Sequence, residues 1–118
     1  MILIDTSIWI NLLGKKQSAN YANELQDLIA GRDIVLTHFQ QLELLQGCKS
    51  EREWLQLSEY LEGQNYLETK SSTWKSAARI FYELRKKGIS VRSPLDCIIA
   101  QIAIERGVYL IHAARELI

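Results

Sequence analysis

The first ten residues constrain the fold most, because a short apolar run there ends abruptly at an acid. Residues 2–4 are Ile, Leu and Ile, and Asp5 follows them directly. Such a run with β-branched members is typical of a strand that is buried on both faces, as in a parallel sheet. Thr6 and Ser7 can cap the helix that the next apolar residues predict. Because ligands in open α/β sheets bind beyond the carboxyl ends of the strands, Asp5 is the first candidate for a catalytic carboxylate.

Strand and helix patterns alternate along the rest of the chain. Short apolar runs predict further strands at residues 34–36 and 108–111, and a weaker one at 65–67. Helical periodicity fills the intervening stretches, and we expect these helices after Ser7, over 19–29, after Thr37 and Ser50, from Thr73 or a neighbouring serine, and after Ser93. The alternation predicts an α/β fold, with a parallel sheet of about four to five short strands flanked by helices in three α/β/α layers.

Length and composition place the chain among ordinary globular proteins. We expect one domain over residues 1–118, because 118 residues with 47% hydrophobic and 24% charged side chains suit a single packed core. Trp9, Trp54 and Trp74 fall at helical core spacing, so packing is the expected role of each, with a dimer interface as the alternative. Cys48 and Cys97 have no metal-type spacing and are expected to be free thiols in a reducing cytoplasm.

Two classes of partner are constrained by the same composition. No apolar run approaches the roughly 20 residues of a membrane span, and the N-terminus lacks the basic start of a signal peptide. We therefore expect a cytoplasmic protein with no membrane partner. Fourteen Lys and Arg residues balance fourteen Asp and Glu residues, so binding to a nucleic acid has to be local or mediated by ions.

Three acids occupy comparable places in the predicted fold. Asp5 follows the first strand, Glu43 lies in the helix after residues 34–36, and Asp96 lies in the first turn of the helix after Ser93. If these points converge on one sheet edge, the carboxylates repel one another unless a cation neutralises them, which favours a Mg²⁺ or Mn²⁺ site. Such an ion polarises a phosphoryl oxygen and activates water, as phosphodiester hydrolysis requires.

Taken singly, each acid also has an ordinary structural explanation. Aspartate at a helix start is usually a cap, and Asp96 fits a capping box with Ser93. Glu43 lies among leucines, although exposed glutamates are common in helices. The order of all three acids is therefore the stronger signal.

Three segments together resemble a known family. They are Ile4-Asp5-Thr6-Ser7-Ile8-Trp9-Ile10, Leu42-Glu43-Leu44-Leu45-Gln46-Gly47 and Pro94-Leu95-Asp96-Cys97-Ile98-Ile99-Ala100. Their order and spacing resemble PIN-domain proteins, in particular the VapC toxins of toxin-antitoxin pairs, over essentially the whole chain. The resemblance implies a metal-dependent endoribonuclease that cuts structured RNA, often tRNA, acts as a homodimer and is silenced by a VapB-type antitoxin.

The resemblance also assigns site residues and exposes one departure. Asp5, Glu43 and Asp96 correspond to acidic catalytic and metal-site residues of the family, and Thr6 or Ser7 to a supporting hydroxyl, with Ser93 and Glu116 as further supporting candidates. The family has another acid after its last clear strand, where this chain has Ala114. Loss of that carboxylate would weaken a second metal position and reduce or abolish cleavage, unless Glu116 fills part of the role. The Ala113-Ala114 pair is either native or introduced to disarm a toxin.

Two other functions compete with the ribonuclease. One is a non-catalytic PIN-like module, in which the missing acid at position 114 is native and the domain serves to dimerise or to occupy an antitoxin. A receiver-like signalling domain has a similar size and an acidic sheet edge, but it requires an adjacent acidic pair after the first strand and a lysine after the last. The single Asp5 and the alanines at 113 and 114 do not fit that pattern.

Overall fold

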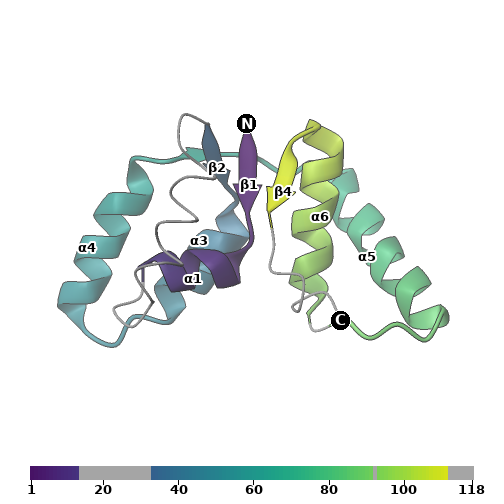
Figure 1. Ribbon diagram of the computed structural model, residues 1–118, viewed down its shortest axis with the longest axis horizontal. Coiled ribbons are helices and arrows are strands. Elements are labelled where there is room, and N and C mark those ends of the chain that lie inside the picture. Colours follow the sequence, from purple (N-terminus) through teal and green to yellow (C-terminus); the bar gives the residue numbers. More distant parts are fainter. Residues whose placement is uncertain (14–32, 92, 112–118) are drawn as a thin grey trace.

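The computed structural model describes residues 1–13, 33–91 and 93–111 (Figure 1). The predicted helix over 19–29 and the residues Ala114 and Glu116 lie outside the described residues. The elements are β1 (Ile2–Ile4), α1 (Thr6–Leu13), β2 (Ile34–Leu36), α3 (His38–Gln46), α4 (Glu51–Glu62), β3 (Asn65–Tyr66), α5 (Ser71–Lys86), α6 (Pro94–Arg106) and β4 (Tyr109–Ile111). No helix among them is long and apolar enough to cross a bilayer.

The strands form one parallel sheet, as the sequence predicts. Their order is β3-β2-β1-β4, so the first strand of the chain pairs on both sides. Ile2 is the register partner of Ile34 in β2 and of Tyr109 in β4. All of β1 is buried, which explains why it is a continuous apolar run and does not alternate with polar residues.

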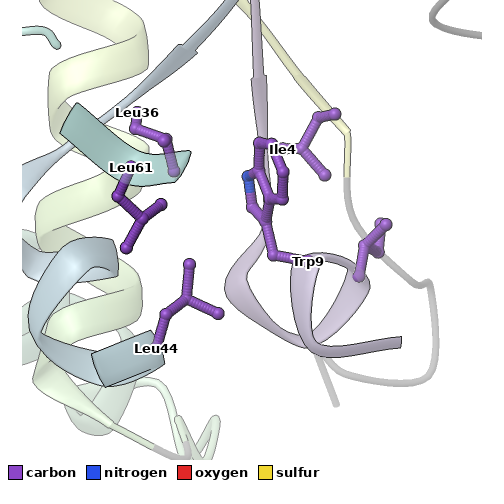
Figure 2. Close-up of a cluster of buried hydrophobic side chains, with 6 residues drawn as sticks. Ile4, Trp9, Leu36, Leu44 and Leu61 are labelled. Carbon is purple, nitrogen blue, oxygen red and sulfur yellow. The ribbon is translucent and has the colours of Figure 1, made fainter. Parts of the chain in front are cut away.

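Helices cover both faces of this sheet. Ile4 and Leu36 pack with Trp9 of α1, Leu44 of α3 and Leu61 of α4. Figure 2 shows the Trp9 indole beside Ile4, with the leucines of β2, α3 and α4 opposite it. On the other face, Leu3 and Val35 pack against Ile99 and Ala103 of α6, and α6 packs in turn against α5. In Figure 1, α1, α3 and α4 therefore lie on one side of the strands and α5 and α6 on the other. The predicted flanked parallel sheet is confirmed.

Local sequence signals set several helix ends. Thr37 caps α3 in a reciprocal capping box with Gln40, and Ser93 caps α6 with Pro94 as its first residue. At the other end of α6, Gly107 has a φ of 63°, a left-handed conformation that glycine adopts without the strain a side chain would add.

One predicted helix start differs from the structure. Thr6 and Ser7 do not cap α1 but lie in its first turn, and Asp5 occupies the position before the helix: its backbone carbonyl accepts from the amides of Ile8 (3.1 Å) and Trp9 (3.2 Å). The carboxylate of Asp5 accepts from the backbone amide of Ser7, so the acid itself caps the helix. α5 begins at Ser71, one of the serines next to Thr73 that the sequence offered as its start. Thr73 is buried in the first turn, where its hydroxyl donates to Glu105 (2.8 Å) of α6.

The packing prediction is right for one tryptophan and wrong for two. Trp9 is buried, but Trp54 in α4 is 43% exposed and Trp74 in α5 is 50% exposed. Helical spacing places a side chain on a stripe of the helix, whereas burial depends on whether another element covers that stripe. Cys48 and Cys97 are free thiols, as expected.

The side chain of Gln40 connects α3 to the central strand β1, and we expect this contact to stabilise the fold. Its side chain is fully buried, its amide nitrogen donates to the Ile4 carbonyl, and its amide oxygen accepts from the backbone amide of Thr37 (3.0 Å). Gln40→Leu leaves two buried backbone groups unpaired, so we expect the free energy of unfolding in urea to fall by about 2–4 kcal/mol.

The matched control is Gln46→Leu, the same change at an exposed position at the end of the same helix. Its free energy of unfolding should stay within about 0.5 kcal/mol of the parent. Equal losses in the two variants would contradict the role given to Gln40.

Candidate active site

The three predicted acids lie on three elements that meet at one edge of the sheet. Asp5 directly follows β1, Glu43 lies within α3, and Asp96 lies in the first turn of α6. All three side chains are half-buried. The backbone amide of Asp5 donates to the carbonyl of Ile111 (2.8 Å), which fixes the end of β1 beside the end of β4.

Hydroxyl groups of α1 hold two of these carboxylates. The Thr6 hydroxyl donates to Oε1 of Glu43 at 2.9 Å and so joins the start of α1 to the middle of α3. The Ser7 hydroxyl donates to the carboxylate of Asp5, which also accepts from the backbone amide of Ser7 at 3.3 Å. Each hydroxyl therefore orients a different acid, whereas the sequence analysis named Thr6 or Ser7 as alternatives for a single supporting hydroxyl.

The pKa of Glu43 is raised by its surroundings, which include both other acids. Burial is the largest effect on its pKa and raises it above the ordinary value, and the hydrogen bond from Thr6 acts in the opposite direction. The charges of Asp96 and then of Asp5 raise the pKa of Glu43 further. The structure thus brings the three carboxylates into one electrostatic neighbourhood, although they are far apart in the sequence.

The donor chemistry at this edge suits a hard divalent cation. Carboxylate and hydroxyl oxygens are the ligands that Mg²⁺ and Mn²⁺ prefer. Within the described residues, no three His, Cys, Asp or Glu side chains are already grouped so that they could hold a metal ion. Mg²⁺ does not require such a cage, because it commonly keeps several waters and binds through one or two carboxylates together with phosphate oxygens of the substrate. The residues present fit a metal of this kind.

Ser93 positions Asp96 through the backbone. Its hydroxyl accepts from the amide of Leu95 at 3.2 Å, and its carbonyl accepts from the amide of Asp96 at 3.1 Å. Ser93 is therefore the cap that starts α6 and sets the place of the acid in the first turn.

Gln40 is a positioning residue that the sequence analysis did not single out. It connects α3, which carries Glu43, to the carbonyl of Ile4, the residue before Asp5. The signal was present, because Thr37 followed three residues later by Gln40 is a capping-box pattern. The hydrogen bond to Ile4, which spans 36 positions, has no local signature.

Comparisons with known proteins agree with this architecture. The profile of the PIN domain family matches residues 2–117. Ribonuclease VapC11 of Mycobacterium tuberculosis is 30% identical over 115 residues, which cover 95% of this chain and 85% of that protein.

Solved structures share the fold. VapBC-1 from nontypeable Haemophilus influenzae superposes with a TM-score of 0.72 at 24% identity, over 98% of this chain and 90% of that one. VapBC2 from Rickettsia felis, solved bound to a DNA fragment from its promoter, gives a TM-score of 0.71 at 23% identity, over 93% and 85% of the two chains. With the family profile spanning nearly all of the sequence, this chain belongs to the PIN domain family and is a relative of the VapC ribonucleases.

Proposed function

We propose that this chain is a VapC-type endoribonuclease that depends on Mg²⁺ or Mn²⁺, with Asp5, Glu43 and Asp96 as its catalytic and metal-binding acids. The observation that carries the proposal is the placement of the acids: Asp5 follows β1, Asp96 lies in the first turn of α6, and Thr6 at the start of α1 holds Glu43 of α3 by a hydrogen bond of 2.9 Å. Clustered carboxylates of this kind are costly without a cation. The names of the relatives, which are VapC ribonucleases, support the choice of reaction.

The chain's own residues have distinct tasks in this mechanism. A bound divalent ion would supply Lewis-acid activation of a phosphoryl oxygen and of water. Ser7 holds the carboxylate of Asp5 in place, and Thr6 holds Glu43 while favouring its charged form, which counteracts the effect of burial. The cap at Ser93 sets Asp96 at the start of α6. These contacts preorganise the oxygen donors before a substrate arrives.

The proposed partners are structured RNA, with tRNA as the first candidate, a VapB-type antitoxin and a second copy of the chain. Toxin-antitoxin complexes among the similar structures support an antitoxin partner. Large apolar side chains are exposed on α3, α4 and α5, which provides surface for protein partners; they include Leu42, Trp54, Leu55, Tyr60 and Trp74.

Ala114 favours one alternative, a non-catalytic PIN-like module that dimerises or occupies an antitoxin. The departure from the acid expected there removes one carboxylate from the family's pattern. A comparison of the RNA cleavage rates of the parent chain and Ala114→Asp distinguishes an enzyme with reduced activity from a chain with none.

The first prediction concerns cleavage of bulk tRNA in Mn²⁺. Ala114→Asp should increase the cleavage rate over that of the parent chain, because it restores an oxygen donor at a second metal position. Adding Asp5→Asn, Glu43→Gln or Asp96→Asn to that variant should lower the rate by more than about 100-fold, since even outer-shell changes at metal sites cost 10- to 100-fold.

Glu59→Gln on exposed α4 is the matched control and should leave the rate unchanged. If neither the parent nor Ala114→Asp cleaves RNA or binds Mn²⁺ in calorimetry, the enzyme proposal is wrong and the non-catalytic module takes its place. Full RNA cleavage activity of the parent chain would exclude the non-catalytic module.

The second prediction concerns stability as a function of pH in metal-free buffer. Because the folded state raises the pKa of Glu43 above the ordinary value of 4.5, the unfolded chain releases this proton first. The contribution of Glu43 to stability therefore falls as the pH rises from 4.5 through the folded-state pKa, and the destabilisation is complete above it. Glu43→Gln should remove this fall and melt at a higher temperature than the parent at pH 7.

Divalent cations should reverse the same effect. Mn²⁺ at pH 7 should raise the melting temperature of the parent by several degrees, since a ligand that binds only the folded state stabilises it. Glu43→Gln should respond less, and Glu59→Gln should behave as the parent does. A parent whose melting temperature is unaffected by Mn²⁺ would contradict the metal site.

A further inference from the structure

The zero net charge of the chain conceals a separation of charge between two helices. α4 carries four glutamates and a single arginine, whereas α5 carries four cations and a single glutamate. Figure 1 shows these helices at opposite ends of the long axis of the molecule. A polyanion therefore meets a repulsive end at α4 and an attractive end at α5.

The cations of α5 form a stripe on its solvent face. Lys75, Arg79, Tyr82 and Lys86 recur at intervals of four, three and four residues, and all four are exposed. The opposite face of the helix holds the buried Thr73 and Ala77. From Lys75 to Lys86 the stripe is about 16 Å long at the rise of an α-helix, enough to follow several consecutive phosphates of one strand.

Aromatic rings hold these cations without neutralising them. The Arg79 guanidinium lies 5.0 Å from the centre of the Tyr82 ring, and the Lys86 ammonium lies 5.8 Å from it. Arg85 stands 5.7 Å from the ring of Phe81 in the same way. A ring restricts the motion of a cation but leaves its charge available, so less conformational entropy remains to be lost when a phosphate binds.

Few carboxylates compete for this charge. Arg79 forms an ion pair with Glu83 at 2.6 Å, and its side chain nevertheless stays 70% exposed. Among the residues that the structure describes, neither Lys75 nor Lys86 has a carboxylate partner within ion-pair distance. The two lysines at the ends of the stripe are therefore its least neutralised cations.

The C-terminal end of the stripe and the turn that carries Asp96 lie at the same end of the pair of helices α5 and α6. α5 and α6 pack through Ala77, Cys97 and Ile102, and the chain reverses between Lys86 and Pro94. The basic end of α5 thus lies at the same end of the helix pair as the turn that carries Asp96 (Figure 1). Carboxylates repel a phosphate backbone, so an RNA strand that reaches them gains affinity from cations along the rest of its path.

We propose that the α5 stripe, formed by Lys75, Arg79, Tyr82 and Lys86, binds the phosphate backbone of RNA that extends from the active site. The choice of RNA over another polyanion rests on the proposed ribonuclease function. Lys75, Arg79 and Lys86 contact phosphates, and Tyr82 is a positioning residue that holds two of these cations in line. The contacts carry no base information, so they add affinity for any RNA sequence.

The test measures RNA binding without cleavage, by fluorescence anisotropy of labelled bulk tRNA in EDTA. Lys75→Gln/Lys86→Gln should weaken binding about tenfold near 0.1 M salt and lower the slope of log affinity against log salt by about one per lysine. The matched control is Lys49→Gln/Arg52→Gln, which removes the same charge at exposed positions before and within α4. It should stay within about twofold of the parent.

Tyr82 variants separate positioning from charge. Tyr82→Leu leaves every charge in place and should weaken binding about two- to fivefold, whereas Tyr82→Phe keeps the ring and should restore it. Melting curves of each variant check that the fold is retained.

Three outcomes would overturn the proposal: equal losses in the α5 and control doubles, no loss in either, or equally tight binding of duplex DNA of the same length through the same lysines. Because no metal or turnover is involved, RNA binding through α5 by a chain that never cleaves would refute only the catalytic proposal. If the chain cleaves RNA but its RNA affinity does not depend on the α5 lysines, only the proposal for the α5 stripe is refuted.

Discussion

The parallel pairing of β1 on both sides is the constraint on which the rest of the structure depends. Because β2 and β4 flank the same strand in parallel, three carboxyl ends lie side by side. Asp5 follows the central strand, and the bond from its amide to Ile111 keeps the neighbouring strand end against it. Gln40 then anchors α3 to the last residue of β1, so Glu43 reaches the same edge from a separate strand-helix unit. The site is thus a consequence of sheet topology and of one buried amide.

The chemistry of the sheet edge follows mainly from the charges of its three carboxylates. A half-buried glutamate whose pKa is raised by burial, and further by the charges of Asp96 and Asp5, is an unfavourable arrangement in a folded protein, and the hydroxyl of Thr6 relieves only part of it. A divalent cation would remove the repulsion and supply the positive field that RNA requires. Charge also matters away from this edge, because a neutral chain binds a polyanion only where its charges are unevenly placed. The cations of α5 and the glutamates of α4 supply that unevenness.

Strands and helix caps that depend on neighbouring residues could be predicted from the sequence. The apolar runs at 2–4 and 34–36 and the caps at Thr37 and Ser93 are local signals, and each of them is found in the structure. The convergence of the acids followed from their positions relative to predicted strands. Two features were beyond such reasoning. The exposure of Trp74 depends on which elements cover a helix, and periodicity does not encode that. Glu43 and Thr6 meet across 37 positions, so no pattern in the sequence could pair them.

The most direct test of the central claim, that these acids form one cation site, is anomalous diffraction from crystals of the chain soaked in Mn²⁺. We expect an anomalous peak at the sheet edge, with carboxylate oxygens of at least two of Asp5, Glu43 and Asp96 at about 2.0–2.3 Å from it. Peaks only elsewhere on the molecule, or a peak held by one of these acids alone with the others turned to solvent, would contradict it.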